Sequence, residues 1–93
     1  MKAKDVSKLC KETFSTEPVV RQIEATFFSG EEEGRYVDFC FIVDGDLYQA
    51  ETKVIPRIID LMGRLEDTPV DFVILPSSAN HHSDGTLVYS RDS

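Results

Sequence analysis

Hydrophobic and polar positions divide the first half of the chain into a helix and two strands. Near the N-terminus, apolar residues recur at the spacing of one helix face: Val6, Leu9, Cys10 and Phe14. This spacing predicts an amphipathic helix over residues 3–14. From Val19 to Phe28, β-forming residues alternate with polar ones, which is typical of a half-buried strand. Ser29 to Gly34 is a predicted turn, and a second alternating strand follows from Arg35 to Val43.

The strongest turn signal in the chain is the dipeptide Asp44-Gly45, because a type I′ hairpin turn needs positive φ at both central residues. A hairpin closed here pairs the preceding strand with a third strand from Leu47 to Val54. Asp38 then faces Glu51 across the hairpin, or Lys53 if the loop shifts by one residue. Side chains two residues apart on a strand share a face. Either register therefore gathers Asp38, Glu51 and Lys53.

The same stretch also fits one long helix. Apolar residues continue along it at helical spacing: Leu47, Ala50, Val54, Ile58, Leu61 and Leu65. Pro56 falls in the middle of this stripe, and an interior proline costs a helix about 3 kcal/mol. A proline fits well in the first turn of a helix. The sequence therefore favours a strand to Val54 followed by a helix over residues 56–66.

The last third of the chain adds two further strands. Val70 to Leu75 is nearly continuous in apolar residues, which predicts a central strand. Asp84-Gly85 marks a turn, and Thr86 to Tyr89 adds a short edge strand. The adjacent His81 and His82 lie in a polar loop, where a solvent-exposed pair is favoured over a pair of metal ligands.

The resulting order, α-β-β-β-α-β with a terminal strand, predicts an α+β fold. We expect a single small domain over residues 1–93, with a mainly antiparallel mixed sheet and helices packed against it. The predicted core combines apolar character with the periods of these elements. It comprises Ile23, Phe27, Phe39, Phe41, Ile58, Ile59, Met62, Val73 and Leu75.

Composition narrows the class of protein. The chain has 93 residues, 41% of them hydrophobic, which suits one domain with a modest core. Its formal net charge of −7 opposes non-specific nucleic-acid binding, because phosphate contacts require Lys and Arg. No apolar run approaches the ~20 residues of a membrane span, and the N-terminus lacks a signal-peptide pattern, so no membrane partner is expected. Cys10 and Cys40 match no metal spacing and make a weak case for a disulfide, so a reducing cytoplasm is the expected location.

Two segments of the chain resemble the PD-(D/E)XK nuclease superfamily: Gly34-Arg35-Tyr36-Val37-Asp38-Phe39, and the stretch from Val43 to Val54. In that superfamily one strand bears an Asp and its hairpin partner bears an acidic-x-Lys triplet. Asp38 and Glu51-Thr52-Lys53 match this pattern. The core order of the superfamily, α-β-β-β-α-β, matches as well, so the resemblance covers most of the chain in topology.

The resemblance implies a metal-dependent nuclease-like protein that acts on nucleic-acid phosphodiesters, as an endonuclease, as a subunit or as an inactive homologue. Asp38 and Glu51 would hold Mg²⁺ or Mn²⁺, since Mg²⁺ takes one or two carboxylates and keeps several waters. Lys53 would position the attacking water and stabilise developing charge. Glu12 would be the acidic residue that many members carry on the first helix. The isolated chain would bind nucleic acid only weakly.

A second hypothesis comes from the charge alone. The chain would be a small acidic protein-interaction module, a regulator or inhibitor that binds a basic partner through Glu31, Glu32, Glu33 and nearby carboxylates. The two hypotheses differ in what they require of Asp38, Glu51 and Lys53. A nuclease needs these side chains in one solvent-open concavity, whereas an interaction module does not.

Overall fold

The computed structural model describes residues 3–30, 34–66, 68–79 and 85–91. Its elements follow one another in the order α-β-β-α-β-β. They are α1 (Ala3–Phe14), β1 (Val20–Gly30), β2 (Gly34–Val43), α2 (Leu47–Arg64), β3 (Val70–Pro76) and β4 (Thr86–Ser90). The α+β class is confirmed, and the predicted order is corrected at one element. The Glu31–Glu33 run and the His81-His82 pair lie outside the described residues.

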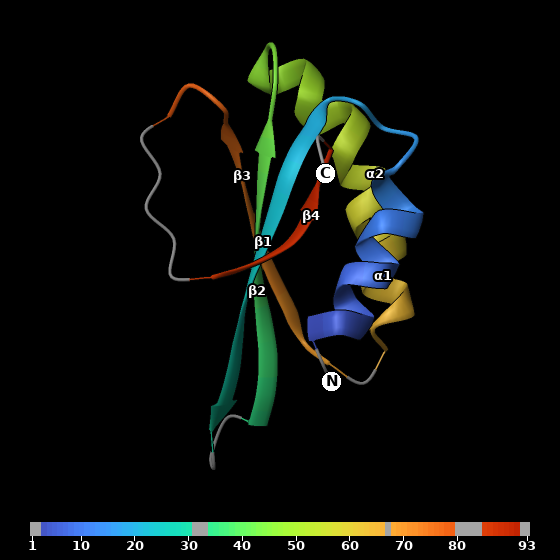
Figure 1. The fold of residues 1–93 in the computed structure, drawn as a ribbon, viewed down its shortest axis with the longest axis vertical. Helices are drawn as coiled ribbons and strands as arrows, with labels where there is room; N and C mark the ends of the chain where they lie inside the picture. The colour runs from blue at the N-terminus through green and yellow to red at the C-terminus, as the bar shows by residue number, and fades with distance from the viewer. Residues whose placement is uncertain (1–2, 31–33, 67, 80–84, 92–93) are drawn as a thin grey trace.

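The four strands form one mixed sheet in the order β3-β2-β1-β4. β1 is antiparallel to both β2 and β4, whereas β3 runs parallel to β2. Both helices lie on the same side of this sheet (Figure 1). We call the sheet face that points away from α1 and α2 the open face. Because side chains alternate along a strand, each strand divides its residues between the helix-covered core and the open face.

The predicted third strand, Leu47 to Val54, is wrong: these residues form the first half of α2. Gly45 does have the positive φ that its turn signal indicated, at 80°. The turn leads into a helix because Asp46 is the N-cap, and its carboxylate accepts a hydrogen bond from the Gln49 backbone N–H at 3.0 Å. An N-cap Asp with Gln three residues later is a helix-start signal in its own right.

Pro56 lies inside α2 rather than at its start. Its missing N–H leaves the Thr52 carbonyl without its helical partner, but both residues are exposed, so water can reach that carbonyl. On the opposite side of the helix, a stripe of side chains is buried against the sheet: Ala50, Val54, Ile58 and Leu61. Burial of one such aliphatic side chain contributes about 1.5–3 kcal/mol. The free energy gained by burying this stripe therefore exceeds the cost of the interior proline.

The core lies between the sheet and the two helices. Of the predicted core residues, four are buried: Ile23, Phe39, Phe41 and Ile58. Phe27 and Met62 pack against the core and are partly buried. Within it, the rings of Phe14, Phe39 and Phe41 contact one another, with centroids 5.3 Å and 5.8 Å apart.

Two members of the predicted core are exposed instead. Ile59 is 64% exposed because α2 buries the stripe that begins at Ala50, and this stripe excludes Ile59. Val73 is 48% exposed because it lies on the open face, and its neighbour Leu75 on that face is only half-buried. The strand that carries both was predicted to be central and is in fact the edge strand β3.

Side-chain contacts hold α1 over the β4 side of the sheet and α2 beside it. The Ser7 hydroxyl donates to the Val88 carbonyl at 2.5 Å, and the Tyr89 hydroxyl donates to the Phe14 carbonyl at 3.4 Å. Arg57 of α2 donates to the Thr13 carbonyl at 3.1 Å, which joins the two helices. Neither helix in the described part of the chain has the length and hydrophobicity that crossing a membrane would take.

Phe39→Ala should lower the free energy of unfolding by about 3–5 kcal/mol, because the ring is buried at the centre of the core and its loss leaves a cavity. Ile59→Ala is the matched control, and it should cost less than about 1 kcal/mol because this side chain is mostly exposed. Urea unfolding followed by circular dichroism measures both. If Ile59→Ala lowered the free energy of unfolding as much as Phe39→Ala, the buried face of α2 would be misassigned.

Candidate functional site

The open face carries two carboxylates side by side. On β2, Val37 and Phe39 are buried under the helices, so Asp38 between them points to the open face. On β3, Asp71 is directly opposite Asp38 in the parallel ladder. Neighbouring strands lie about 4.8 Å apart. The two side chains are therefore adjacent members of one row across the sheet.

This pair is electrostatically unfavourable. Like charges in opposed positions destabilise a sheet, by up to about 1 kcal/mol. Within the described ranges, neither carboxylate forms an ion pair or a side-chain hydrogen bond. Among the described residues, no cation compensates this like-charge pair.

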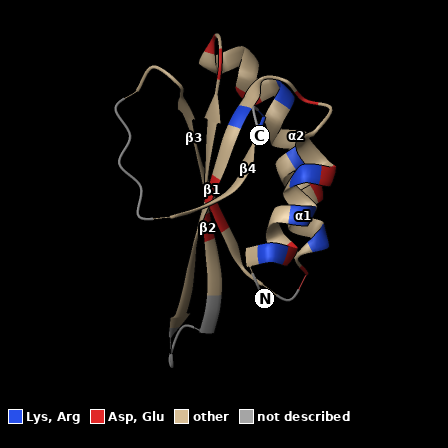
Figure 2. Cartoon of the chain, viewed as in Figure 1, with Lys and Arg blue, Asp and Glu red and all other residues tan. Residues whose placement is uncertain are grey.

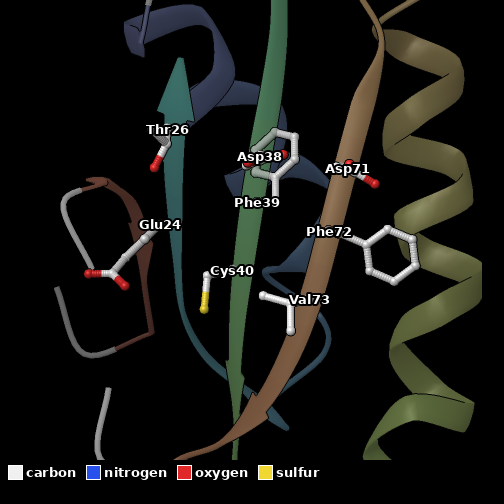
Figure 3. Close-up of a pocket in the computed structure, with 8 residues that line it drawn as sticks. All are labelled: Glu24, Thr26, Asp38, Phe39, Cys40, Asp71, Phe72 and Val73. Atoms are coloured by element: carbon white, nitrogen blue, oxygen red, sulfur yellow. The ribbon is translucent and has the colours of Figure 1, made fainter. Parts of the chain in front are cut away.

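A shallow hollow of about 340 Å³ surrounds the pair. Figure 3 shows Asp38 and Asp71 on neighbouring strands, with Glu24 on β1 beyond them. The apolar part of the lining includes Cys40 and Val73, which lie one step further along the same strands. The hollow therefore combines three carboxylates with apolar surface.

An aromatic pair extends the apolar part of the open face. Phe28 and Tyr36 face each other across β1 and β2, and their rings stack with centroids 4.6 Å apart and planes within 8°. Phe28 is one of the large hydrophobic side chains that remain exposed. The open face can thus contact aliphatic or aromatic groups as well as cations.

Glu51 and Lys53, the other two predicted site residues, lie elsewhere. Both are on α2, which packs on the helix-covered face, whereas Asp38 is on the open face. The sheet separates the two sets. The hairpin that would have gathered Asp38, Glu51 and Lys53 is absent from the structure.

The described residues contain no group of three or more His, Cys, Asp or Glu side chains placed to hold a metal ion. Glu12 on α1 lies 3.4 Å from Arg64 of α2, so it takes part in a surface ion pair between the helices. The metal site, the nuclease assignment and the role of Mg²⁺ or Mn²⁺ stay predictions from the sequence motif.

Cys10 and Cys40 are both buried, and neither forms a disulfide. Burial raises the pKa of Cys10 to about 12, and burial with the nearby charge of Glu24 raises the pKa of Cys40 to about 11. Both thiols are therefore protonated at neutral pH. Because the thiolate is the nucleophile, Cys40 serves as part of the apolar lining of the hollow rather than as a reactive group.

A second polar cluster lies where β2 ends, and the sequence did not reveal it. Asp44 pairs with Arg91 at 2.8 Å and with Arg21 at 3.6 Å. A hydrogen bond from the Ser77 side chain, and then the two guanidinium groups, lower the pKa of Asp44, against a raising effect of burial. The Asp44 side chain thus ties together the residues that follow β2, β3 and β4. Arg91 is far from Asp44 in sequence, so no local motif could show this role.

Comparison of the chain with protein-family models, with curated proteins and with solved structures gives no match.

Asp38→Asn should raise the free energy of unfolding by about 0.5–1 kcal/mol at low ionic strength, because it removes the repulsion from Asp71. Added salt screens that repulsion, so the gain should shrink as ionic strength rises. Glu51→Gln removes the same charge from α2 and should change stability by less than about 0.5 kcal/mol. Urea titrations at two salt concentrations measure these effects, and a loss of stability in Asp38→Asn would contradict the repulsion.

Asp44→Asn should destabilise the fold at neutral pH, with a loss that disappears in acid. The lowered pKa means that the folded state prefers the ionised carboxylate. The ionised Asp44 carboxylate contributes its full stabilisation above the unfolded-state pKa of about 3.9. This contribution is lost as the pH falls through the lower folded-state pKa. Unfolding curves of wild type and variant should therefore converge as the pH falls below about 4. A difference that is constant with pH would show that ionisation of Asp44 is not involved.

Proposed function

We propose that this protein is a small acidic protein-interaction module that binds a basic segment of a protein partner at its open face. The observation that carries the proposal is the adjacent pair Asp38 and Asp71, which lines an open hollow and has no cation partner within the described part of the chain. Proteins retain unfavourable surface arrangements where binding requires them, at a cost in stability. A cation from a partner would relieve the repulsion that the free protein tolerates.

The distribution of charge over the molecule supports this proposal. In Figure 2 the acidic bands on the sheet lie in the middle of the strands, while most basic bands lie on α1 and α2. The three basic residues of α1 are Lys4, Lys8 and Lys11, and those of α2 are Lys53, Arg57 and Arg64. These cations belong to the helix layer and not to the open face, where Asp38 and Asp71 lie.

The lining of the hollow suits the side chains of Lys and Arg. Their charged ends form strong hydrogen bonds with carboxylates, and their aliphatic stems pack along apolar surface. The hollow supplies the carboxylates of Asp38 and Asp71 and, beside them, the apolar surface of Val73. A basic protein segment would therefore find partners for both parts of each long side chain.

The same surface is a poor match for a nucleic-acid backbone. Phosphate binding draws its affinity from Lys and Arg, whereas the open hollow has three carboxylates in its lining. A protein partner is therefore preferred over nucleic acid, and phosphodiester cleavage has no geometric support among the described residues.

A short peptide of alternating Lys and Val, blocked at both ends, tests the proposal as a probe. In ¹H–¹⁵N spectra it should shift the signals of Asp38, Asp71 and their strand neighbours, with binding that weakens as salt rises from about 20 to about 300 mM. The double variant Asp38→Asn, Asp71→Asn should weaken binding by about tenfold or more, since two charge-assisted contacts are lost.

The matched control removes two carboxylates from the helix layer through Glu12→Gln and Asp60→Asn, which both pair with Arg64. This control should keep the wild-type affinity within about twofold, because only the total charge changes and the open face is intact. Equal weakening by both double variants would mean that the peptide responds to net charge alone, and the proposed site would be rejected.

A further inference from the structure

We infer that the partner segment binds as an added β-strand along the outer edge of β3, with alternating basic and apolar side chains. This inference rests on the proposed function, and it specifies the conformation and sequence pattern of the bound segment. It depends on three features that meet at β3: an open backbone edge, an exposed apolar stripe on α2, and acidic surroundings.

Among the residues that the structure describes, β3 pairs with β2 on one side and with no strand on the other. In the parallel ladder, the Val37 N–H donates to the Pro69 carbonyl at 3.1 Å and the Ser77 N–H donates to the Val43 carbonyl at 2.8 Å. Residues at odd positions in β3 therefore direct their backbone groups to β2. Those at even positions, Val70, Phe72 and Ile74, direct theirs outward. Pro76, the next even position, has no N–H, so Ile74 is the last residue of β3 that offers an outward N–H donor.

On the helix side of this edge, an apolar surface is exposed. The Phe72 ring points from β3 toward α2 (Figure 3) and is 41% exposed. On α2 the exposed side chains Tyr48, Ile55 and Ile59 lie at positions i, i+7 and i+11, so they share one side of the helix. An apolar side chain of an added strand would enter between this stripe and Phe72.

The stripe must lie on the β3 side of α2, because the other side is occupied. Arg57 and Arg64 are turned toward α1, where they contact Thr13 and Glu12. Lys53 precedes Arg57 by one helical turn and lies on that same side. The basic side chains of α2 thus face α1, which leaves the β3 side with the apolar stripe and with Glu51.

On the open face, the same edge is acidic. Asp71 is the only charged residue of β3, and Asp38 lies beside it on β2. Successive side chains of an added strand would point alternately toward Asp71 and toward the apolar stripe. Charge complementarity therefore requires basic residues at every second position and apolar residues between them. Strand addition of this kind draws its affinity from the backbone and its specificity from alternate side chains.

The opposite edge of the sheet does not offer these features. β4 is short, and its register with β1 is irregular between Ile23 and Glu24. The hollow beside it includes Lys11 and Arg91 in its lining, which would repel a basic strand. A basic segment therefore selects β3 and not β4.

Amide hydrogen exchange with the alternating Lys–Val peptide distinguishes this mode from other ways of binding. At saturating peptide, exchange should slow by about tenfold or more at the amides of Val70, Phe72 and Ile74. The amides of Asp71 and Val73 already face β2, so their exchange should stay within about twofold of the free protein. A peptide of the same composition, with its Lys and Val residues grouped instead of alternating, should bind about tenfold more weakly.

Two variants locate the bound strand. Ile59→Lys places a cation in the apolar stripe at an exposed position and should weaken binding by about tenfold. Ala3→Lys adds the same charge at an exposed position of α1 and should leave the affinity within about twofold. Urea unfolding of both variants checks that each is folded.

Three results would overturn the inference. If the peptide binds and depends on Asp38 and Asp71 without new protection at Phe72 and Ile74, it lies flat on the open face, and only the proposed function stands. If protection at those amides rises with protein concentration in the absence of peptide, the edge pairs with a second copy of this chain. If the peptide does not bind at all at low salt, the proposed function fails together with the inference.

Discussion

The apolar cluster that joins α1 and α2 to a single face of the sheet is the interaction on which the other features depend. Phe39 and Phe41 of β2 are buried in it together with Ala50, Val54 and Ile58 of α2. Because both helices cover one face, the alternate residues of every strand are left without a helix layer. Asp38 and Asp71 are on that open face, and no strand of the described residues pairs with the outer side of β3. One-sided burial thus provides the core, the acidic surface and the open edge at once.

Patterns with a short period were sufficient to predict much of this fold. The 3.6-residue repeat predicted α1, and the two-residue alternation predicted β1 and β2, with Phe39 inside and Asp38 outside. The error at residues 47–54 came from weighting Asp44-Gly45 and Pro56 above the Asp46–Gln49 capping signal and the long apolar stripe. A capped helix tolerates one exposed proline when its other side is buried. Tertiary packing therefore decided between two patterns that the sequence contained.

The candidate site was less predictable than the fold. Asp38 could be placed on an exposed strand face from local alternation alone. Its neighbour Asp71 could not be identified in advance, because the two residues meet only when β3 returns parallel to β2 after the whole of α2. Glu51 and Lys53 were assigned to the site through a strand that does not form. Residues that act together across a parallel pair have no fixed spacing in sequence, so only the topology shows them.

The central claim is that residues 47–54 form a helix on the covered face and so leave Asp38 beside Asp71 on the open face. Nuclear Overhauser contacts in the free protein test this claim most directly. The account predicts helical i, i+3 contacts from Leu47 through Val54, together with contacts between the strands that carry Asp38 and Asp71. Cross-strand contacts from Asp38 to Glu51 or Lys53 would contradict it, because they would restore the hairpin and gather the three residues of the nuclease motif.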